Sequence, residues 1–164
     1  MILTTHAVIG AGIATLVPQN PALGFGLAFA SHFLLDAIPH WDYQLNSRYE
    51  DHSDLKNDDM LLGRAFVGDL FKIGLDFVIG LALAWLILTW LKPEISLVTI
   101  LLGVLGGMAP DFLQFAYFKL KREPLTSLQR FHQWIHTSWR LKNKPIVGLG
   151  LQALLVTTFL VLVL

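Results

Sequence analysis

The sequence contains no cysteine, and its positive and negative charges cancel. Without cysteine, disulfides and thiolate metal sites are excluded, so histidine, aspartate and glutamate are the strong metal ligands that remain. A net charge of zero leaves no basic surface of the kind that neutralises nucleic-acid phosphates. We therefore predict no nucleic-acid partner.

Charged residues are scarce, at 15% of the 164 residues, whereas 54% are hydrophobic. The apolar residues form long blocks, and the charges gather in two polar segments, at about 42–65 and 119–144. Long apolar blocks between polar segments are typical of a chain that crosses a lipid bilayer. We predict one all-α membrane domain over residues 1–164, an integral helical bundle of about five spans.

Turn residues mark the limits of these spans. The predicted spans cover about 2–17, 22–38, 66–91, 95–118 and 146–164. The first two are joined by the turn Pro18-Gln19-Asn20-Pro21 and are short for a ~30 Å hydrocarbon core. Each arm has small residues at four-residue spacing, which include Gly10 in the first arm and Gly26 in the second. They predict close packing between the two arms.

The second polar segment contains a predicted amphipathic helix over about 127–140. Thr126 to Gln129 has the spacing of a capping box, and apolar residues then recur near the helical period. Trp134 and Trp139 suit the headgroup level, so we expect this helix to lie in the membrane interface. The basic residues of 119–144 predict that this side is cytoplasmic.

The ionisable residues in or beside the predicted spans fall toward that same side. They are His6, His32, Asp36, His40, Asp69, Asp76, Asp111, His132 and His136. Charges in membrane spans are costly and are kept mainly for function. Their shared depth therefore predicts one polar site at the cytoplasmic face.

His32 and Asp36 are the first candidate metal ligands. They are four residues apart, so on a helix their side chains lie on one face and can bind the same ion. Pro39 disfavours helix at the residue before it, so His40 is expected just past the helix end, within reach of that ion.

Three further candidates lie later in the chain. His132 and His136 repeat the four-residue spacing, although they could instead form the polar edge of an interfacial helix. Asp111 follows Gly106-Gly107 and Pro110, which should break or kink the fourth span and suggest a site there.

Several polar residues have alternative roles. His6 could be a hydrogen-bonded structural residue rather than a ligand. Lys72 is spaced to pair with Asp69, whereas Asp76 is a ligand candidate. The acidic segment 50–59 is expected to be a solvated loop, from which His52 could supply a ligand.

These motifs resemble those of a known family. An early Thr5-His6, a helix-ending His32-x-x-x-Asp36, Pro110-Asp111 and a late His132/His136 pair occur in order between residues 4 and 138. The set resembles the bacterial membrane-bound metal-dependent hydrolases of the inner membrane, a group itself similar to zinc-dependent phospholipase C.

The resemblance implies hydrolysis of a phosphoester, in a phospholipid or a lipid-linked phosphate, by metal-activated water. It places His6, His32, Asp36, Asp111, His132 and His136 at the metal site. From the residue types, the metal is expected to be Zn²⁺, with Mn²⁺ or Fe²⁺ as alternatives, and Asp42 or Asp76 is expected to act as the base. The alternative is a non-catalytic membrane protein: a metal-ion carrier, a sensor or a helical scaffold.

Overall fold

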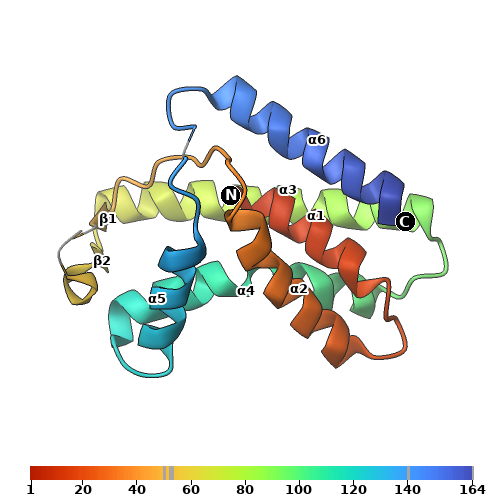
Figure 1. Cartoon of the computed structure of the whole chain (residues 1–164), viewed down its shortest axis with the longest axis horizontal. Helices are drawn as coiled ribbons and strands as arrows, with labels where there is room; N and C mark the ends of the chain where they lie inside the picture. The colour runs from red at the N-terminus through yellow and green to blue at the C-terminus, as the bar shows by residue number, and fades with distance from the viewer. Residues whose placement is uncertain (50, 52–53, 140, 164) are drawn as a thin grey trace.

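The computed structural model describes residues 1–49, 51, 54–139 and 141–163, and His52, a possible ligand, lies outside this part. The described residues form α1 (Leu3–Ala14), α2 (Pro21–Asp36), α3 (Arg64–Leu91), α4 (Leu97–Leu120), α5 (Leu125–Ile135) and α6 (Pro145–Val163). A short 3₁₀ helix, η1 (Leu55–Asn57), lies between the two strands β1 (Arg48–Tyr49) and β2 (Asp59–Met60), which pair antiparallel. The all-α class is confirmed (Figure 1).

Among the described helices, α3, α4 and α6 are long and apolar enough to cross a membrane. This is fewer than the five spans that the sequence predicted. Helices α1 and α2 have 12 and 16 residues, or about 18 and 24 Å at ~1.5 Å per residue, and fall short of the ~20 residues of a typical span. The turn after Ala14 and the end of α2 at Asp36, before Pro39, shorten both arms.

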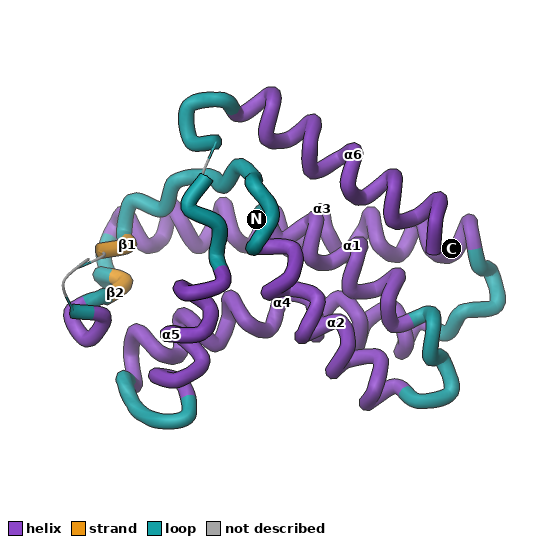
Figure 2. Tube along the Cα trace, in the orientation of Figure 1, coloured by secondary structure: helices purple, strands orange, loops and turns teal. Residues whose placement is uncertain are grey.

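Helix α1 lies at the centre of the bundle, as the trace in Figure 2 shows. Ten of its 12 residues are buried. The apolar core around it comprises Leu3, Ala7, Val8 and Ala11 with Ala84 and Leu88 of α3 and Ile100, Val104 and Met108 of α4. Helix α1 therefore meets protein, rather than lipid, on most of its surface.

Glycines bring α1 and α4 into backbone contact. A Cβ added to Gly103 would lie 2.5 Å from Cα of Ala11, and one added to Gly10 would lie 2.6 Å from the carbonyl oxygen of Gly103. The close packing predicted for Gly10 is therefore with α4. Gly26 of α2 has no heavy atom within 4 Å of its added Cβ, so it makes no such contact.

Helix α4 continues through Pro110, where the sequence predicted a break or kink. Proline removes one backbone donor from a helix and crowds the preceding turn. The carbonyl oxygen of Gly107, in that turn, lies 2.8 Å from Nδ1 of His32. This part of α4 therefore serves as a polar contact for α2 without ending the helix.

Helix α5 ends earlier than the predicted limit of 140. His136 has an extended backbone, and the chain after it follows the segment after α2. The N–H of Thr137 donates to the carbonyl of Asp36 (2.8 Å), and the N–H of Leu141 donates to that of His40 (3.0 Å). This pairing holds His136 beside the end of α2, while Trp134 remains exposed.

Asp76, halfway along α3, anchors the first turn of α1. Its carboxylate accepts hydrogen bonds from the N–H of Leu3 (2.7 Å), the N–H of Thr4 (3.0 Å) and the hydroxyl of Thr4 (2.6 Å). The first N–H groups of a helix have no partner within the helix, so Asp76 acts as a cap supplied by another helix.

Replacing Asp76 with alanine should destabilise the bundle. The change leaves partly buried backbone donors of α1 without acceptors, which costs about 1–3 kcal/mol. Thermal unfolding in detergent measures the loss. Asp59→Ala is the matched control, because Asp59 lies at the surface, where it pairs with Lys119 (2.7 Å) and accepts from the N–H of the adjacent Met60 (2.7 Å), and its loss should cost at most ~1 kcal/mol. Equal unfolding temperatures for the two variants would contradict the anchoring role.

Candidate metal centre

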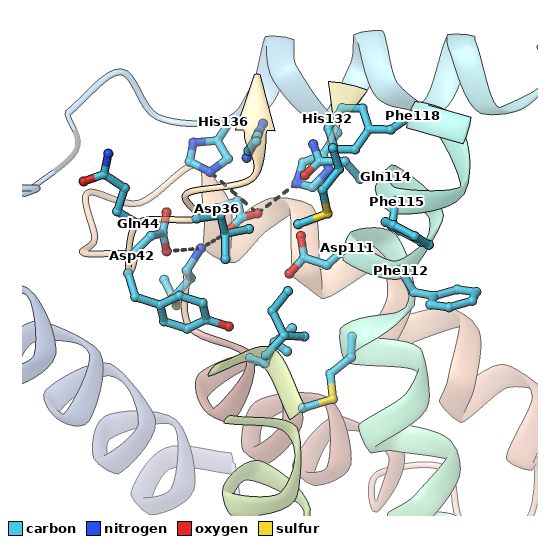
Figure 3. A pocket seen from close by; sticks show the side chains of 18 of the residues that line it. Asp36, Asp42, Gln44, Asp111, Phe112, Gln114, Phe115, Phe118, His132 and His136 are labelled. Carbon is cyan, nitrogen blue, oxygen red and sulfur yellow. Dashed lines mark hydrogen bonds and ion pairs between the residues drawn. The ribbon is translucent and has the colours of Figure 1, made fainter. Parts of the chain in front are cut away.

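Asp36 is the centre of a buried cluster of imidazoles. It is the last residue of α2 and is 2% exposed. Nε2 of His132 and Nε2 of His32 lie 2.9 and 3.1 Å from its Oδ2, and Nε2 of His6 lies 3.2 Å from its Oδ1. Figure 3 shows His132 and His136 directed toward this carboxylate.

More distant ligands complete two groups that share Asp36. Nε2 of His40 is 3.9 Å from Oδ1, and Nε2 of His136 is 4.0 Å from Oδ2. Oδ1 of Asp111 lies 3.7 Å from Nε2 of His32. Each of two sets has its ligand atoms within 4.8 Å of one another and could hold a metal ion: His32, Asp36, Asp111 and His132; and Asp36, His40 and His136.

In three of these imidazoles, the hydrogen bond made by Nδ1 determines which ring nitrogen keeps its lone pair. Nδ1 of His32, His40 and His136 lies 2.8, 2.7 and 3.2 Å from the carbonyl oxygens of Gly107, Ile38 and Thr137, respectively. A carbonyl oxygen only accepts, so Nδ1 carries the proton in each ring. In the neutral ring, Nε2 then has an unprotonated lone pair. Nε2 of His32 and of His136 faces Asp36, whereas Nε2 of His40 lies closer to Asp42, at 3.1 Å, than to Asp36, at 3.9 Å.

This arrangement fits a cation. Nε2 of His32 lies 3.3 Å from Nε2 of His132, and both face a carboxylate oxygen. Lone pairs repel one another at such distances unless a proton or a cation lies between them. Ligand atoms around a tetrahedral ion with ~2.0–2.1 Å bonds stand about 3.3 Å apart, and histidine ligands usually donate their other N–H to a carbonyl or carboxylate. The residues present therefore suit a metal ion.

The terminal ammonium group of Met1 also reaches the cluster. It is buried, 2.8 Å from Oδ1 of Asp36 and 2.9 Å from Oδ1 of Asp42. It thus places one positive charge beside two carboxylates.

His136 and Asp42, which lie outside the helices, have shifted pKa values. Burial lowers the pKa of His136 to about 4, so its imidazole is neutral and able to bind metal at pH 7. Burial alone would raise the pKa of Asp42, but the His40 ring, 3.1 Å away, and the Met1 ammonium outweigh it and hold that pKa below its ordinary value. Asp42 is therefore ionised at neutral pH.

The two aspartates of α3, Asp69 and Asp76, make contacts outside this cluster. Asp69 accepts from the N–H and the hydroxyl of Ser47, both at 2.7 Å, and pairs with Lys72 at 3.0 Å, as the spacing predicted. Asp76 has both oxygens engaged by the first turn of α1. The structure thus brings six of the seven predicted metal ligands into the two ligand groups. His6 contacts Asp36 but belongs to neither group, and Asp76 lies apart from both.

Two residues that support the site were not predicted from the sequence. Asp58, expected in a solvated loop, is 1% exposed and accepts from the N–H of Asp51 (2.7 Å) and from Gln133 (3.1 Å). Gln152 of α6 accepts from the hydroxyl of Thr5 (3.1 Å) and donates to the carbonyl of Trp41 (2.8 Å). A lone amide in an otherwise apolar helix was the available signal, because such residues hydrogen-bond between helices.

The cluster opens into a pocket of about 1210 Å³. Asp36, Asp42, Asp111, His132 and His136 lie in its wall, together with apolar residues of α3 and α4. Comparisons of the chain with family models, curated proteins and solved structures found no match. The site is therefore interpreted from its own geometry.

Proposed function

We propose that this chain is a membrane-embedded, metal-dependent hydrolase that cleaves a phosphoester of a membrane lipid. One observation carries the proposal. Three imidazoles donate their Nδ1 protons to backbone carbonyls and turn Nε2 toward a carboxylate, which is Asp36 for His32 and His136, and Asp42 with Asp36 behind it for His40. This is the geometry of a metal site whose ligands are held by an outer layer of hydrogen bonds.

We further propose Zn²⁺ as the ion, held by His32, Asp36, Asp111 and His132, with Mn²⁺ and Fe²⁺ able to use the same donors. His40 and His136 supply a second position on Asp36, and His6 supports the cluster by stacking on His32 at a centroid distance of 3.9 Å. When bound, such an ion polarises a phosphoryl oxygen and makes water acidic enough to attack at neutral pH.

Asp42 is the proposed base. It lies in the pocket wall, is partly exposed to the pocket, and is oriented by His40 at 3.1 Å. Its ionised carboxylate can accept a proton from water beside Asp36. Asp76, the other candidate base, is not in the pocket wall and holds the first turn of α1, so we assign it to the structure of the bundle.

Asp42→Asn should lower the rate of hydrolysis by about 10²–10⁴-fold while the metal content stays at the wild-type level. Asparagine keeps the shape of the side chain but cannot take the proton. Steady-state kinetics beside elemental analysis separate the two effects. An unchanged rate would remove Asp42 from the reaction, and a loss of metal would make it a ligand instead.

Turnover by reconstituted protein tests the function itself. Vesicles of defined phospholipids would be incubated with metal-stripped protein and with protein reloaded with Zn²⁺, Mn²⁺ or Fe²⁺, and released phosphorylated headgroup would be measured. We expect release from the reloaded protein and none after chelation. Loaded protein that cleaves no phospholipid or lipid-linked phosphate would reject the proposed reaction.

A non-catalytic scaffold is the competing function, and the Met1 ammonium favours it. That group offsets one of the two negative charges of Asp36 and Asp42 without a metal. A scaffold should keep its cellular role when His32 and Asp36 are both replaced by alanine, whereas a hydrolase should lose it. A metal carrier would instead move ions across sealed vesicles.

We place the protein in the bacterial cytoplasmic membrane, with the site on the side of the basic 119–144 segment.

A further inference from the structure

The pocket beside the metal centre is too large for a small soluble phosphoester alone. Its volume of about 1210 Å³ exceeds the ~300–1,000 Å³ of pockets that take drug-sized ligands. Much of its wall is apolar. Residues of α3 and α4 in this apolar part include Phe66, Leu70, Ile73, Gly74, Phe77, Phe112 and Phe115, and we call this part the α3–α4 groove.

The groove lies beside the first turn of α1. From Leu3 onward α1 fills the space between α3 and α4, as the contacts of Gly80 with Thr4 and Ala7 show. Met1 and Leu3 lie in the pocket wall together with residues from the first half of α3 and the second half of α4. At its outer end the two helices meet again where Phe66 and Phe115 stack at 5.9 Å.

The length of the groove matches one leaflet. From Phe66 to Phe77 helix α3 rises about 17 Å at ~1.5 Å per residue. Half of a ~30 Å hydrocarbon core is about 15 Å. The groove also reaches the outer surface of α3, because Leu70 and Gly74 line both the pocket and a shallow apolar depression on that surface.

The chemistry changes along the pocket. Phe112 and Phe115 of α4 lie to one side of the labelled acidic and imidazole groups in Figure 3. Asp36, Asp111 and His132 form the polar end, and Lys142 and Arg48 also line the pocket and bring positive charge to it. A molecule that suits both ends has a long apolar chain and a headgroup whose phosphoryl group the metal of the proposed function would hold against the carboxylates of the polar end.

We propose that the α3–α4 groove holds an acyl chain of a membrane phospholipid, which enters sideways from the bilayer and places its phosphoryl group at the His/Asp cluster. The assignment of the headgroup to that cluster rests on the proposed function. The occupancy of the groove by the chain is a separate property and is measured without turnover.

The test uses the full-length purified protein in phosphatidylethanolamine vesicles that contain a phosphatidylglycerol with a diazirine on one acyl chain. After illumination, mass spectrometry locates the labelled residues. We expect label on groove residues such as Ile73, Phe77 and Phe115. Gly74→Trp should reduce this label by at least about tenfold, a change of ~1.4 kcal/mol in binding free energy.

Gly68→Trp is the matched control. Gly68 lies on the same helix, and, like Gly74, it has open space around an added Cβ, but it does not line the pocket. Its groove label should equal that of the wild type. Leu70→Trp provides a second obstruction of the groove if Gly74→Trp does not fold.

Label confined to outward-facing residues such as Phe71 and Leu154, and unaffected by Gly74→Trp and Leu70→Trp, would overturn the proposal. Groove labelling in a protein that hydrolyses nothing would support the lipid site and reject the hydrolase. Hydrolysis without groove labelling would support the hydrolase and reject the lipid site. The two proposals therefore fail separately.

Discussion

Replacing Asp36 with asparagine should remove both metal positions at once. Asp36 is the one residue common to the two ligand groups. The amide keeps the size of the side chain but loses its negative charge and one acceptor oxygen, so five neighbouring imidazoles lose their shared counter-charge. Removing even an outer hydrogen-bond partner of a metal ligand costs about 10–100-fold in affinity, so we expect at least ~100-fold weaker binding here.

Titration of metal-stripped protein with Zn²⁺ measures this loss. The informative comparison is His40→Ala/His136→Ala, which removes two members of one group and leaves His32, Asp36, Asp111 and His132 intact. That double variant should lose the weaker binding step and keep the tighter one. Near-wild-type binding by Asp36→Asn would show that Asp36 does not join the two positions.

Gly103→Leu should prevent the bundle from assembling. A Cβ at this position lies 2.5 Å from Cα of Ala11 and 2.7 Å from the carbonyl oxygen of Gly10. Both atoms belong to the backbone of a buried helix, so they cannot turn aside as a side chain would. Overpacking of a core usually costs about 1–3 kcal/mol, and helix separation on this scale should cost more.

Gly150→Leu is the control for that substitution. Gly150 lies in α6, and an added Cβ there meets nothing within 4 Å. Size-exclusion profiles and thermal unfolding in detergent should show a wild-type-like control and an aggregated or strongly destabilised Gly103→Leu. Equal stability would mean that α1 and α4 are not in backbone contact.

Much of the helical architecture could be predicted from the sequence because the signals are local. Apolar blocks and turn residues located α3, α4 and α6 to within a few residues. Composition does not show whether a helix is surrounded by lipid or by apolar protein. For this reason α1 and α2 were predicted as spans although they are short. Gly10 likewise showed that close packing occurs, but not that its partner is α4.

The candidate site was predictable where its residues share one helix. His32 and Asp36 face the same way because they are four residues apart, and their side chains lie 3.1 Å from each other. His136 reaches them by a different route than predicted, through an extended segment held by the carbonyls of Asp36 and His40. The anchoring contacts of Asp76 depend on where α1 begins, which is a tertiary property.

We infer that the buried His/Asp cluster binds a divalent metal. Elemental analysis of detergent-purified protein, wild type beside His32→Ala/Asp36→Ala, tests it most directly once both are shown to be equally folded. We predict stoichiometric zinc, manganese or iron in the wild type and none in the double variant. A wild type that holds no metal, even after metal is added back and excess is removed, would contradict the account.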